Sequence, residues 1–229
     1  MKKTRSGVDL RLYLVTDRGL AGGRSLEEIV YQSVAGGVTA VQLREKEATA
    51  RQFLQQGEAL RRATSKLGIP FLVNDRVDIA QACGADGVHL GQSDMPCALA
   101  RRILGEGRII GVSVSTLEEA VEAQAEGADY LGVGPVFATS TKVDALPATG
   151  LGLLEAIGRA VAIPLVGIGG INQTNAGEVI LAGASGVAVV SAIIAGADPG
   201  KAARSLRSKT DAATEEVSRR YGKKYPKIV

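Results

Sequence analysis

Short apolar runs alternate with amphipathic segments along most of the chain. The apolar runs cover 12–15, 41–43, 71–73, 88–90, 109–112, 130–136, 165–170 and 187–191, and each stops at glycine or polar residues or leads into a polar loop. Runs of this length with such boundaries are typical of buried strands, and the amphipathic segments between them are typical of helices. The pattern predicts eight strands, each followed by a helical segment, the last of which covers 199–221.

Helix boundaries reinforce this pattern. Ser25 with Glu28, and Thr116 with Glu119, have the spacing of capping boxes. Short segments that contain glycine, at 35–37, 83–85, 126–128 and 182–184, each end a helix before an even-numbered strand, where glycine enters the left-handed region without strain. A period of two βα units indicates a (β/α)8 TIM barrel, not an open sheet. We expect one domain over 1–229, with the barrel at about 10–200 and a C-terminal helix and basic tail at about 199–229.

Composition narrows the class of protein. Hydrophobic residues make up 45% of the 229 residues and aromatic residues 3%, so the core must be aliphatic, as in parallel sheets covered by helices. A net charge of +3 with few aromatic residues argues against nucleic acid binding. No apolar run approaches the ~20 residues of a membrane span, and 1–9 lack the apolar stretch of a signal peptide. We therefore expect a cytoplasmic protein in which Cys83 and Cys97 are buried thiols.

The candidate chemistry lies where strands end, because α/β folds bind ligands at the carboxyl ends of parallel strands. Gly167 to Gly170, and Val190 with Ser191, end the seventh and eighth strands. Barrels often bind phosphate there through backbone N–H groups and a helix N-terminus. A tight turn without a ligand is the alternative.

Two acidic residues follow neighbouring strands. Asp75 ends the third strand and Asp94 lies just beyond the fourth, so their carboxylates should meet at one rim. Paired carboxylates favour a hard cation, and the expected metal is Mg²⁺, held jointly with substrate phosphates. The alternative is that both residues are helix N-caps.

Basic residues converge on the same rim. Arg44 and Lys46 end the second strand, and Lys142 lies in a long loop at 138–149 that we expect to act as a lid. Together they predict a phosphate clamp. A diphosphate ester carries about −3 charges near neutral pH. With the two aspartates, it would be balanced by Mg²⁺ and the three basic side chains.

Six motifs together resemble those of the thiamine phosphate synthase family. They are QLREK at 42–46, NDR at 74–76, HLGQSD at 89–94, GPVF at 134–137, TSTK at 139–142 and GIGGI at 167–171. The resemblance covers about 12–199 in the family's order. Ala138 departs from the proline or serine common in the family, and 145–149 look variable, which bears on loop closure only.

The resemblance implies a transferase. It would condense 4-amino-2-methyl-5-hydroxymethylpyrimidine diphosphate with 4-methyl-5-(2-hydroxyethyl)thiazole phosphate to give thiamine phosphate and pyrophosphate. It places the diphosphate on Gln42, Arg44, Lys46, Asn74 and Lys142, and Mg²⁺ on Asp75 and Asp94. It places the pyrimidine against Ser113 and the thiazole phosphate on Thr139, Ser140, Thr141, Gly170, Val190 and Ser191. Leu43 and Glu45, within the first motif, are expected to contact substrate, and Arg44, Lys46, Ser113 and Lys142 are the expected catalytic residues.

The implied mechanism is dissociative. Pyrophosphate leaves first and the thiazole nitrogen attacks the resulting cation, so leaving-group stabilisation matters more than a general base. His89, the one histidine, could face the barrel or the helices, and we interpret it as structural. Alternatives are a thiazole tautomerase-like isomerase on the same fold and a non-catalytic phosphate-binding barrel. Neither has a use for the full set of Asp75, Asp94 and Lys142. The sequence leaves homo-oligomer formation open, and the basic C-terminal segment is expected to be a solvated helix.

Overall fold

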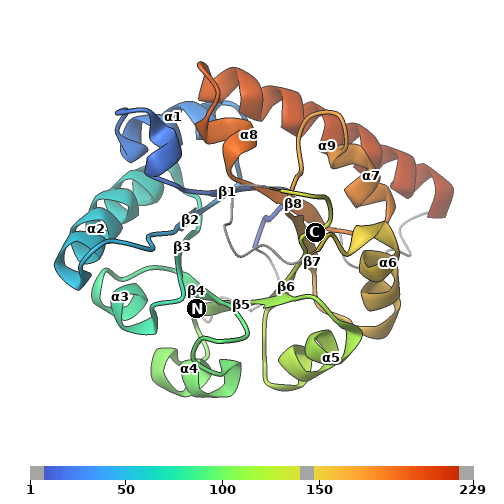
Figure 1. Cartoon of the computed structure of the whole chain (residues 1–229), viewed down its shortest axis with the longest axis horizontal. Helices are drawn as coiled ribbons and strands as arrows, with labels where there is room; N and C mark the ends of the chain where they lie inside the picture. Colours follow the sequence, from blue (N-terminus) through green and yellow to red (C-terminus); the bar gives the residue numbers. More distant parts are fainter. Residues whose placement is uncertain (1–7, 140–146, 222–229) are drawn as a thin grey trace.

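The computed structural model describes residues 8–139 and 147–221. Its strands form a closed barrel in chain order, and each strand pairs in parallel with its neighbours (Figure 1). The strands are β1 (Leu12–Val15), β2 (Ala40–Leu43), β3 (Phe71–Asn74), β4 (Gly87–Leu90), β5 (Ile109–Val114), β6 (Tyr130–Val133), β7 (Leu165–Ile168) and β8 (Gly186–Val189). The predicted eight-stranded TIM barrel is confirmed.

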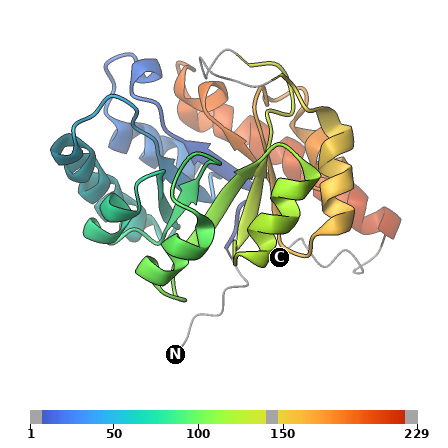
Figure 2. The ribbon, with the colours of Figure 1, turned by 60° about the horizontal axis from the view of Figure 1, so that its bottom comes forward.

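Helices enclose the strands on all sides (Figures 1 and 2). They are α1 (Leu26–Ala35), α2 (Ala50–Leu67), α3 (Val77–Ala82), α4 (Cys97–Leu104), α5 (Leu117–Ala125), α6 (Gly150–Ala160), α7 (Ala176–Leu181), α8 (Ser191–Ile194) and α9 (Pro199–Tyr221), with a 3₁₀ turn η1 (Gly19–Ala21). Among the described residues, β6, β7 and β8 are shorter than predicted, and β8 gives way to α8 at Ser191. Pro135 cannot donate to the β6 ladder, and Gly169 and Gly170 leave β7 with positive φ.

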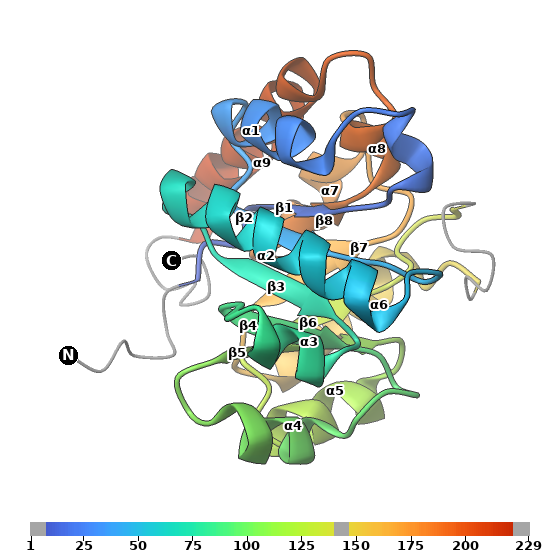
Figure 3. The same cartoon turned by 90° about the vertical axis from the view of Figure 1, so that its left-hand side faces the viewer.

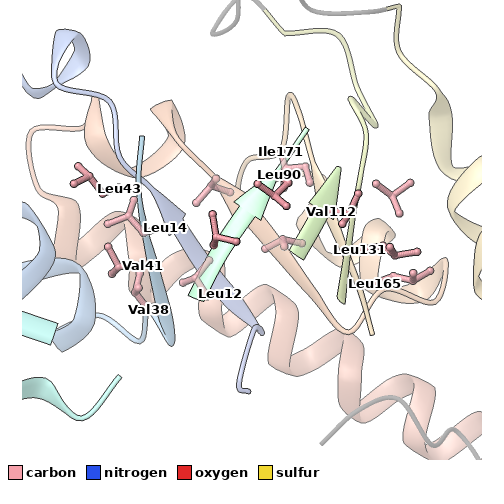
Figure 4. Close-up of a cluster of buried hydrophobic side chains, with 14 of the residues drawn as sticks. Leu12, Leu14, Val38, Val41, Leu43, Leu90, Val112, Leu131, Leu165 and Ile171 are labelled. Carbon is pink, nitrogen blue, oxygen red and sulfur yellow. The ribbon is translucent and has the colours of Figure 1, made fainter. Parts of the chain in front are cut away.

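Two apolar clusters divide the interior. The larger lies between the strands and the helices, and includes Leu12, Leu14, Val41 and Leu43 (Figure 4). The smaller fills the inside of the barrel with the alternate residues of the same strands, among them Tyr13, Leu72 and Val166. Successive side chains of a strand point to opposite faces, so β1, β2, β3, β6, β7 and β8 supply residues to both clusters. This alternation decides which residues can face a ligand.

Local signals in the sequence position the helices. The side chains of Ser25 and Thr116 accept hydrogen bonds from the backbone N–H groups of Glu28 and Glu119, at 3.1 Å each. A complete capping box forms elsewhere, between Thr49 and Gln52. The glycines predicted to end helices adopt positive φ, as expected, at Gly37, Gly84, Gly127 and Gly183.

The C-terminal helix corrects one expectation. One face of α9, with Ala203, Leu206, Thr210, Ala213 and Val217, is buried. It packs against α1 and α7, which Figures 1 and 3 show beside it. The basic residues occupy the other positions of the helix. The segment is therefore part of the barrel's outer layer and is solvated on one side only.

Both cysteines are buried and form no disulfide, as predicted. Burial raises the pKa of the Cys97 thiol to about 11 and also raises that of Cys83. Both thiols are therefore neutral near pH 7. Within 8–139 and 147–221, no helix has the length and apolar character needed to cross a membrane.

Gly87→Ala should strongly destabilise the barrel. A Cβ at Gly87 would lie 2.0 Å from the carbonyl oxygen of Ile109, on the adjacent strand. The backbone must shift, so we expect the free energy of unfolding to fall by about 2–4 kcal/mol in urea denaturation. Gly158→Ala is the control, because its Cβ would meet only Leu165 at 3.6 Å within a helix. It should be neutral or stabilising, by up to about 1 kcal/mol. Equal losses in both variants would contradict this account.

Candidate active site

A cavity of about 670 Å³ opens at the carboxyl ends of the strands. Every strand contributes lining residues, from Val15 on β1 to Val189 on β8. Of the residues predicted to form the site, those that line the cavity are Gln42, Arg44, Lys46, Asn74, Asp75, Asp94, Ser113, Thr139, Gly170, Val190 and Ser191. Side chains that are far apart in the sequence are thus brought around one space.

The structure places two predicted contacts elsewhere. The Leu43 side chain is fully buried in the outer cluster (Figure 4). The Glu45 side chain is 5% exposed and forms an ion pair with Arg18 at 2.9 Å. Gln42 and Arg44 point into the barrel, so alternation turns Leu43 and Glu45 away from it. Their assignment as side chains that face the substrate is therefore corrected. Ser140, Thr141 and Lys142, with most of the predicted lid, lie outside the described residues.

The acidic pair forms as predicted. Asp75 and Asp94 lie at the ends of adjacent strands, and their carboxyl groups share a hydrogen bond. The Asp94 carboxylate also accepts a hydrogen bond from the backbone N–H of Gly91 at 2.7 Å. Neither residue is a helix N-cap, since those positions belong to Arg76 and Pro96. The capping alternative is therefore wrong.

Asp75 has an unusual backbone. Its φ is 65°, and within the described part of the chain it is the single non-glycine residue with positive φ. Aspartate tolerates this left-handed region better than most residues, but at a cost in energy. Such strain is typical of functional sites, where surrounding contacts hold the residue in place. The backbone N–H of Asp75 donates to the carbonyl of His89 at 2.8 Å, which helps to fix this conformation.

The pKa values of the two carboxyl groups are shifted in opposite directions. Burial favours a higher pKa for Asp75, but hydrogen bonds from Lys46 and Asp94, with the charge of Lys46, hold the pKa below its ordinary value. Burial and the hydrogen bond to Asp75 raise the pKa of Asp94. Two carboxylates this close repel each other when both are ionised. The pair is thus a place where a cation would be stabilised.

Two of the three basic side chains predicted for this rim, those of Arg44 and Lys46, line the cavity. Lys46 Nζ lies 2.8 Å from Asp75 Oδ2, and its side chain is 52% exposed. Arg44 Nη1 lies 3.4 Å from Asp17 Oδ2, and within the described residues nothing accepts a hydrogen bond from Arg44 Nε. Asp17 was not foreseen. It adds one negative charge to the rim, so the predicted charge balance leaves out a carboxylate.

The glycine-rich end of β7 and the end of β8 also line the cavity. Gly169 and Gly170 have φ values of 95° and 64°. A Cβ at Gly170 would lie 2.5 Å from the carbonyl oxygen of Ala138, so only glycine fits against the segment after β6. The expected helix N-terminus is present at one of these ends. The α8 helix, four residues long, begins at Ser191 directly after β8, whereas α7 begins only at Ala176. Anion binding at these ends would rest on backbone N–H groups and Ser191.

His89 faces the barrel interior, a question that the sequence left open. It is in register with Asn74 on β3 and lines the cavity. Its ring joins two hydroxyls, with Nε2 2.8 Å from Ser113 Oγ and Nδ1 2.8 Å from Tyr130 Oη. The signal was available in Val88 and Leu90, whose apolar side chains flank a polar one, as expected if His89 alone points inward.

Comparison with known proteins agrees with this geometry. The model of the thiamine monophosphate synthase family matches residues 12–193. The chain belongs to this family. It is 53% identical over 210 residues to the thiamine-phosphate synthase of Chloroflexus aurantiacus, covering 92% of this chain and 97% of that protein. It is 56% identical over 203 residues to that of Albidiferax ferrireducens, covering 89% and 93%.

A solved structure of the family has the same fold. The thiamine phosphate pyrophosphorylase from Pyrococcus furiosus superposes with a TM-score of 0.83 at 44% identity, covering 90% of this chain and 97% of that one. As a member of the thiamine monophosphate synthase family, the chain is an enzyme, a transferase of thiamine biosynthesis.

Substitutions at Asp75 should separate backbone strain from chemistry. At a φ of 65°, we expect Asp75→Gly to be about 1 kcal/mol more stable than Asp75→Ala in urea denaturation without divalent cations. Asp78, in the first turn of α3, provides the control. There the order should reverse, because glycine is less favourable than alanine inside a helix. An alanine variant at position 75 as stable as the glycine variant would contradict the strain argument.

Proposed function

We propose that the protein joins 4-amino-2-methyl-5-hydroxymethylpyrimidine diphosphate to 4-methyl-5-(2-hydroxyethyl)thiazole phosphate, giving thiamine phosphate and pyrophosphate. The observation that carries the proposal is the arrangement of the cavity. Asp75, after β3, and Gly170, after β7, stand four strands apart in the eight-stranded ring, on opposite sides of it. One side carries the carboxylates and the positively charged side chains, and the other side carries the glycine-rich turn. Family membership supports this pairing of two anionic substrates.

The diphosphate belongs on the charged side. Arg44 and Lys46 are both at the mouth, and their positive side chains would hold diphosphate oxygens there through charge-assisted hydrogen bonds. Asn74 and Lys142 complete the proposed contacts. Gln42 is 3% exposed and donates to Tyr13 at 2.9 Å, so it lies deeper than Arg44 and Lys46. We therefore assign Gln42 to the pyrimidine end of this substrate.

The acidic pair fits Mg²⁺. This ion prefers oxygen ligands and is usually held by one or two carboxylates together with substrate phosphates. Asp75 and Asp94 provide those carboxylates, and the opposite shifts of their pKa values reflect how closely they interact, so a cation between them would be stabilised. Within the described residues, no group of three His, Cys, Asp or Glu side chains forms a cage that could hold a metal without substrate. Bound Mg²⁺ would neutralise charge on the leaving pyrophosphate.

The chemical step follows from this placement. The bond between the pyrimidine methylene carbon and the diphosphate oxygen breaks, and its electron pair leaves with pyrophosphate. The thiazole nitrogen then donates its lone pair to the carbon, forming the new C–N bond. No proton has to be transferred, so no general base is needed. Lys46 and Arg44 stabilise the growing charge on pyrophosphate, and Ser113 holds the pyrimidine.

The thiazole phosphate is assigned to the opposite side. Thr139, Gly170, Val190 and Ser191 line the cavity there. Ser140 and Thr141, which follow Thr139 in the sequence, complete the proposed contacts. Backbone N–H groups at such turns bind phosphate without requiring a positive side chain. The negative charge of Asp17 on the other side makes separation of the two anions more important, because that rim is less positive than the sequence indicated.

Product formation from the two substrates tests the proposed function directly. Thiamine phosphate should form only with Mg²⁺, and Asp94→Asn should lower the rate at least about a hundredfold, since it removes a charged metal ligand worth several kcal/mol. Asp78→Asn is the matched control, because Asp78 is an exposed carboxylate that pairs with Arg76. It should keep wild-type activity. Isomerisation of a thiazole without any use of the diphosphate would instead identify the tautomerase-like alternative.

Separate kinetics for each substrate test the division of the cavity. Lys46→Ala should raise KM for the pyrimidine diphosphate and also lower kcat, because charge on pyrophosphate grows as the bond breaks. Ser191→Ala should raise KM for the thiazole phosphate alone. Ser191 is a cleaner site than Gly170, where any Cβ would collide with the segment after β6. If both variants weakened the same substrate, the assignment of two anion sites would be wrong.

A further inference from the structure

A continuous chain of hydrogen bonds crosses the inside of the barrel. It starts at Gln42 on β2, whose Nε2 donates to Tyr13 Oη on β1 at 2.9 Å. Tyr13 Oη lies 3.1 Å from Tyr130 Oη on β6. From Tyr130 the chain continues through His89 on β4 to Ser113 on β5, with 2.8 Å at each step. The chain therefore links five strands through side chains alone.

The two tyrosines are the hidden part of this chain. Each is 1% exposed, and neither lines the large cavity. Gln42, His89 and Ser113, which they connect, do line it. Tyr13 and Tyr130 therefore lie beneath the cavity floor, and their hydrogen bonds reach the cavity through those three residues.

Two glycines make room for the side chains that form these hydrogen bonds. A Cβ at Gly111 would lie 2.1 Å from the Tyr130 ring, and one at Gly132 would lie 3.0 Å from His89 Cε1. The tyrosine rings also meet edge to face, with centroids 6.1 Å apart and planes at 75°. The surrounding strands thus hold Tyr130 and His89 in one arrangement. This close packing distinguishes their hydrogen bond from a chance contact in a loosely packed core.

The direction of the hydrogen bonds follows from counting protons. Burial raises the pKa of both tyrosines, so each keeps its hydroxyl proton. The Tyr13 hydroxyl accepts a hydrogen bond from Gln42. Within this series of hydrogen bonds, the acceptor for the Tyr13 proton is therefore the hydroxyl oxygen of Tyr130. Tyr130 then donates to His89 Nδ1, and the His89 proton resides on Nε2 and points to Ser113. Ser113 accepts this bond, so its own proton turns to the cavity.

We propose that Tyr13 and Tyr130 are positioning residues. Because each group in the series from Gln42 to Ser113 donates to the next, they orient the Ser113 hydroxyl so that it donates a hydrogen bond to the substrate's pyrimidine. The target would be a ring nitrogen, an acceptor without a proton. The kinetic part of this inference rests on the proposed function, whereas the order of protons in the free protein does not.

The single histidine of the chain makes the proton order measurable. In uniformly ¹⁵N-labelled protein without a histidine tag, two-bond ¹H–¹⁵N correlation spectra report which ring nitrogen of His89 carries the proton. At a pH where the ring is neutral, we expect the proton on Nε2. Tyr130→Phe removes the donor to Nδ1, and the preference should be lost. A proton on Nδ1 in the wild-type protein would overturn the proposed direction.

Kinetics test the positioning role. Tyr130→Phe and Tyr13→Phe should each lower kcat/KM for the pyrimidine diphosphate roughly three- to tenfold, as expected for one lost hydrogen bond, and leave KM for the thiazole phosphate unchanged. The double variant should be no worse than the more affected single variant, because one break interrupts the chain. Tyr31→Phe, at an exposed position on α1, is the matched control and should match wild type.

The kinetic and the spectroscopic experiments test different parts of the proposal. Unchanged kcat/KM in both buried variants, or equal effects on both substrates, would overturn the positioning role even with the proton on Nε2. Should Tyr130→Phe fail to fold, Tyr13→Phe and the wild-type spectrum still decide. A wild-type protein that makes no thiamine phosphate would overturn the proposed function, while the spectrum would still confirm or refute the proton order.

Discussion

Strand alternation in a closed parallel barrel is the constraint on which the rest of this structure depends. Each strand must supply apolar side chains to the helices on one face and fill the inside of the barrel with the other. On β2, Val41 and Leu43 pack outward, while Gln42 and, just after the strand, Arg44 point inward. Since all strands run in parallel, their polar inward residues gather at one end. The apolar inward residues, such as Leu72 and Val166, close the barrel below them. The same rule thus builds both the core and the site.

Polar groups inside such a barrel must be hydrogen-bonded, because an unpaired buried group costs about 1–3 kcal/mol. At the floor of the cavity, the polar side chains are hydrogen-bonded to one another through the two tyrosines and His89. The rim meets this requirement only in part. Asp75 and Asp94 share a hydrogen bond between like groups, and Asp75 holds a left-handed backbone. Stability is therefore concentrated in the floor, and the residues at the rim are arranged for charges that come with a ligand.

Much of this was predictable from the sequence, for reasons that also explain the errors. Bounded apolar runs gave the strands, and strand ends gave Asp75, Asp94 and Arg44. Leu43 and Glu45 were misassigned because a contiguous motif was treated as one surface, although its alternate residues face opposite ways. Asp17 was missed because its partner, Arg44, comes from a different strand. Tyr13 and Tyr130 resemble ordinary core aromatics in sequence. Periodicity shows that a residue is buried but not which hydroxyl it meets across a barrel.

The distribution of charge over the cavity suits the proposed reaction. Among the described lining residues, the carboxylates are Asp75, Asp94 and Glu119, each beyond the end of a strand, whereas Gln42, His89 and Ser113 form the floor. A pyrimidine-methyl cation is strongly electrophilic, and a carboxylate beneath it could capture it in place of the thiazole. Charges confined to the rim can stabilise pyrophosphate without offering that competing nucleophile. A floor of mutually hydrogen-bonded groups can hold the ring in one orientation while leaving the cation to the thiazole nitrogen.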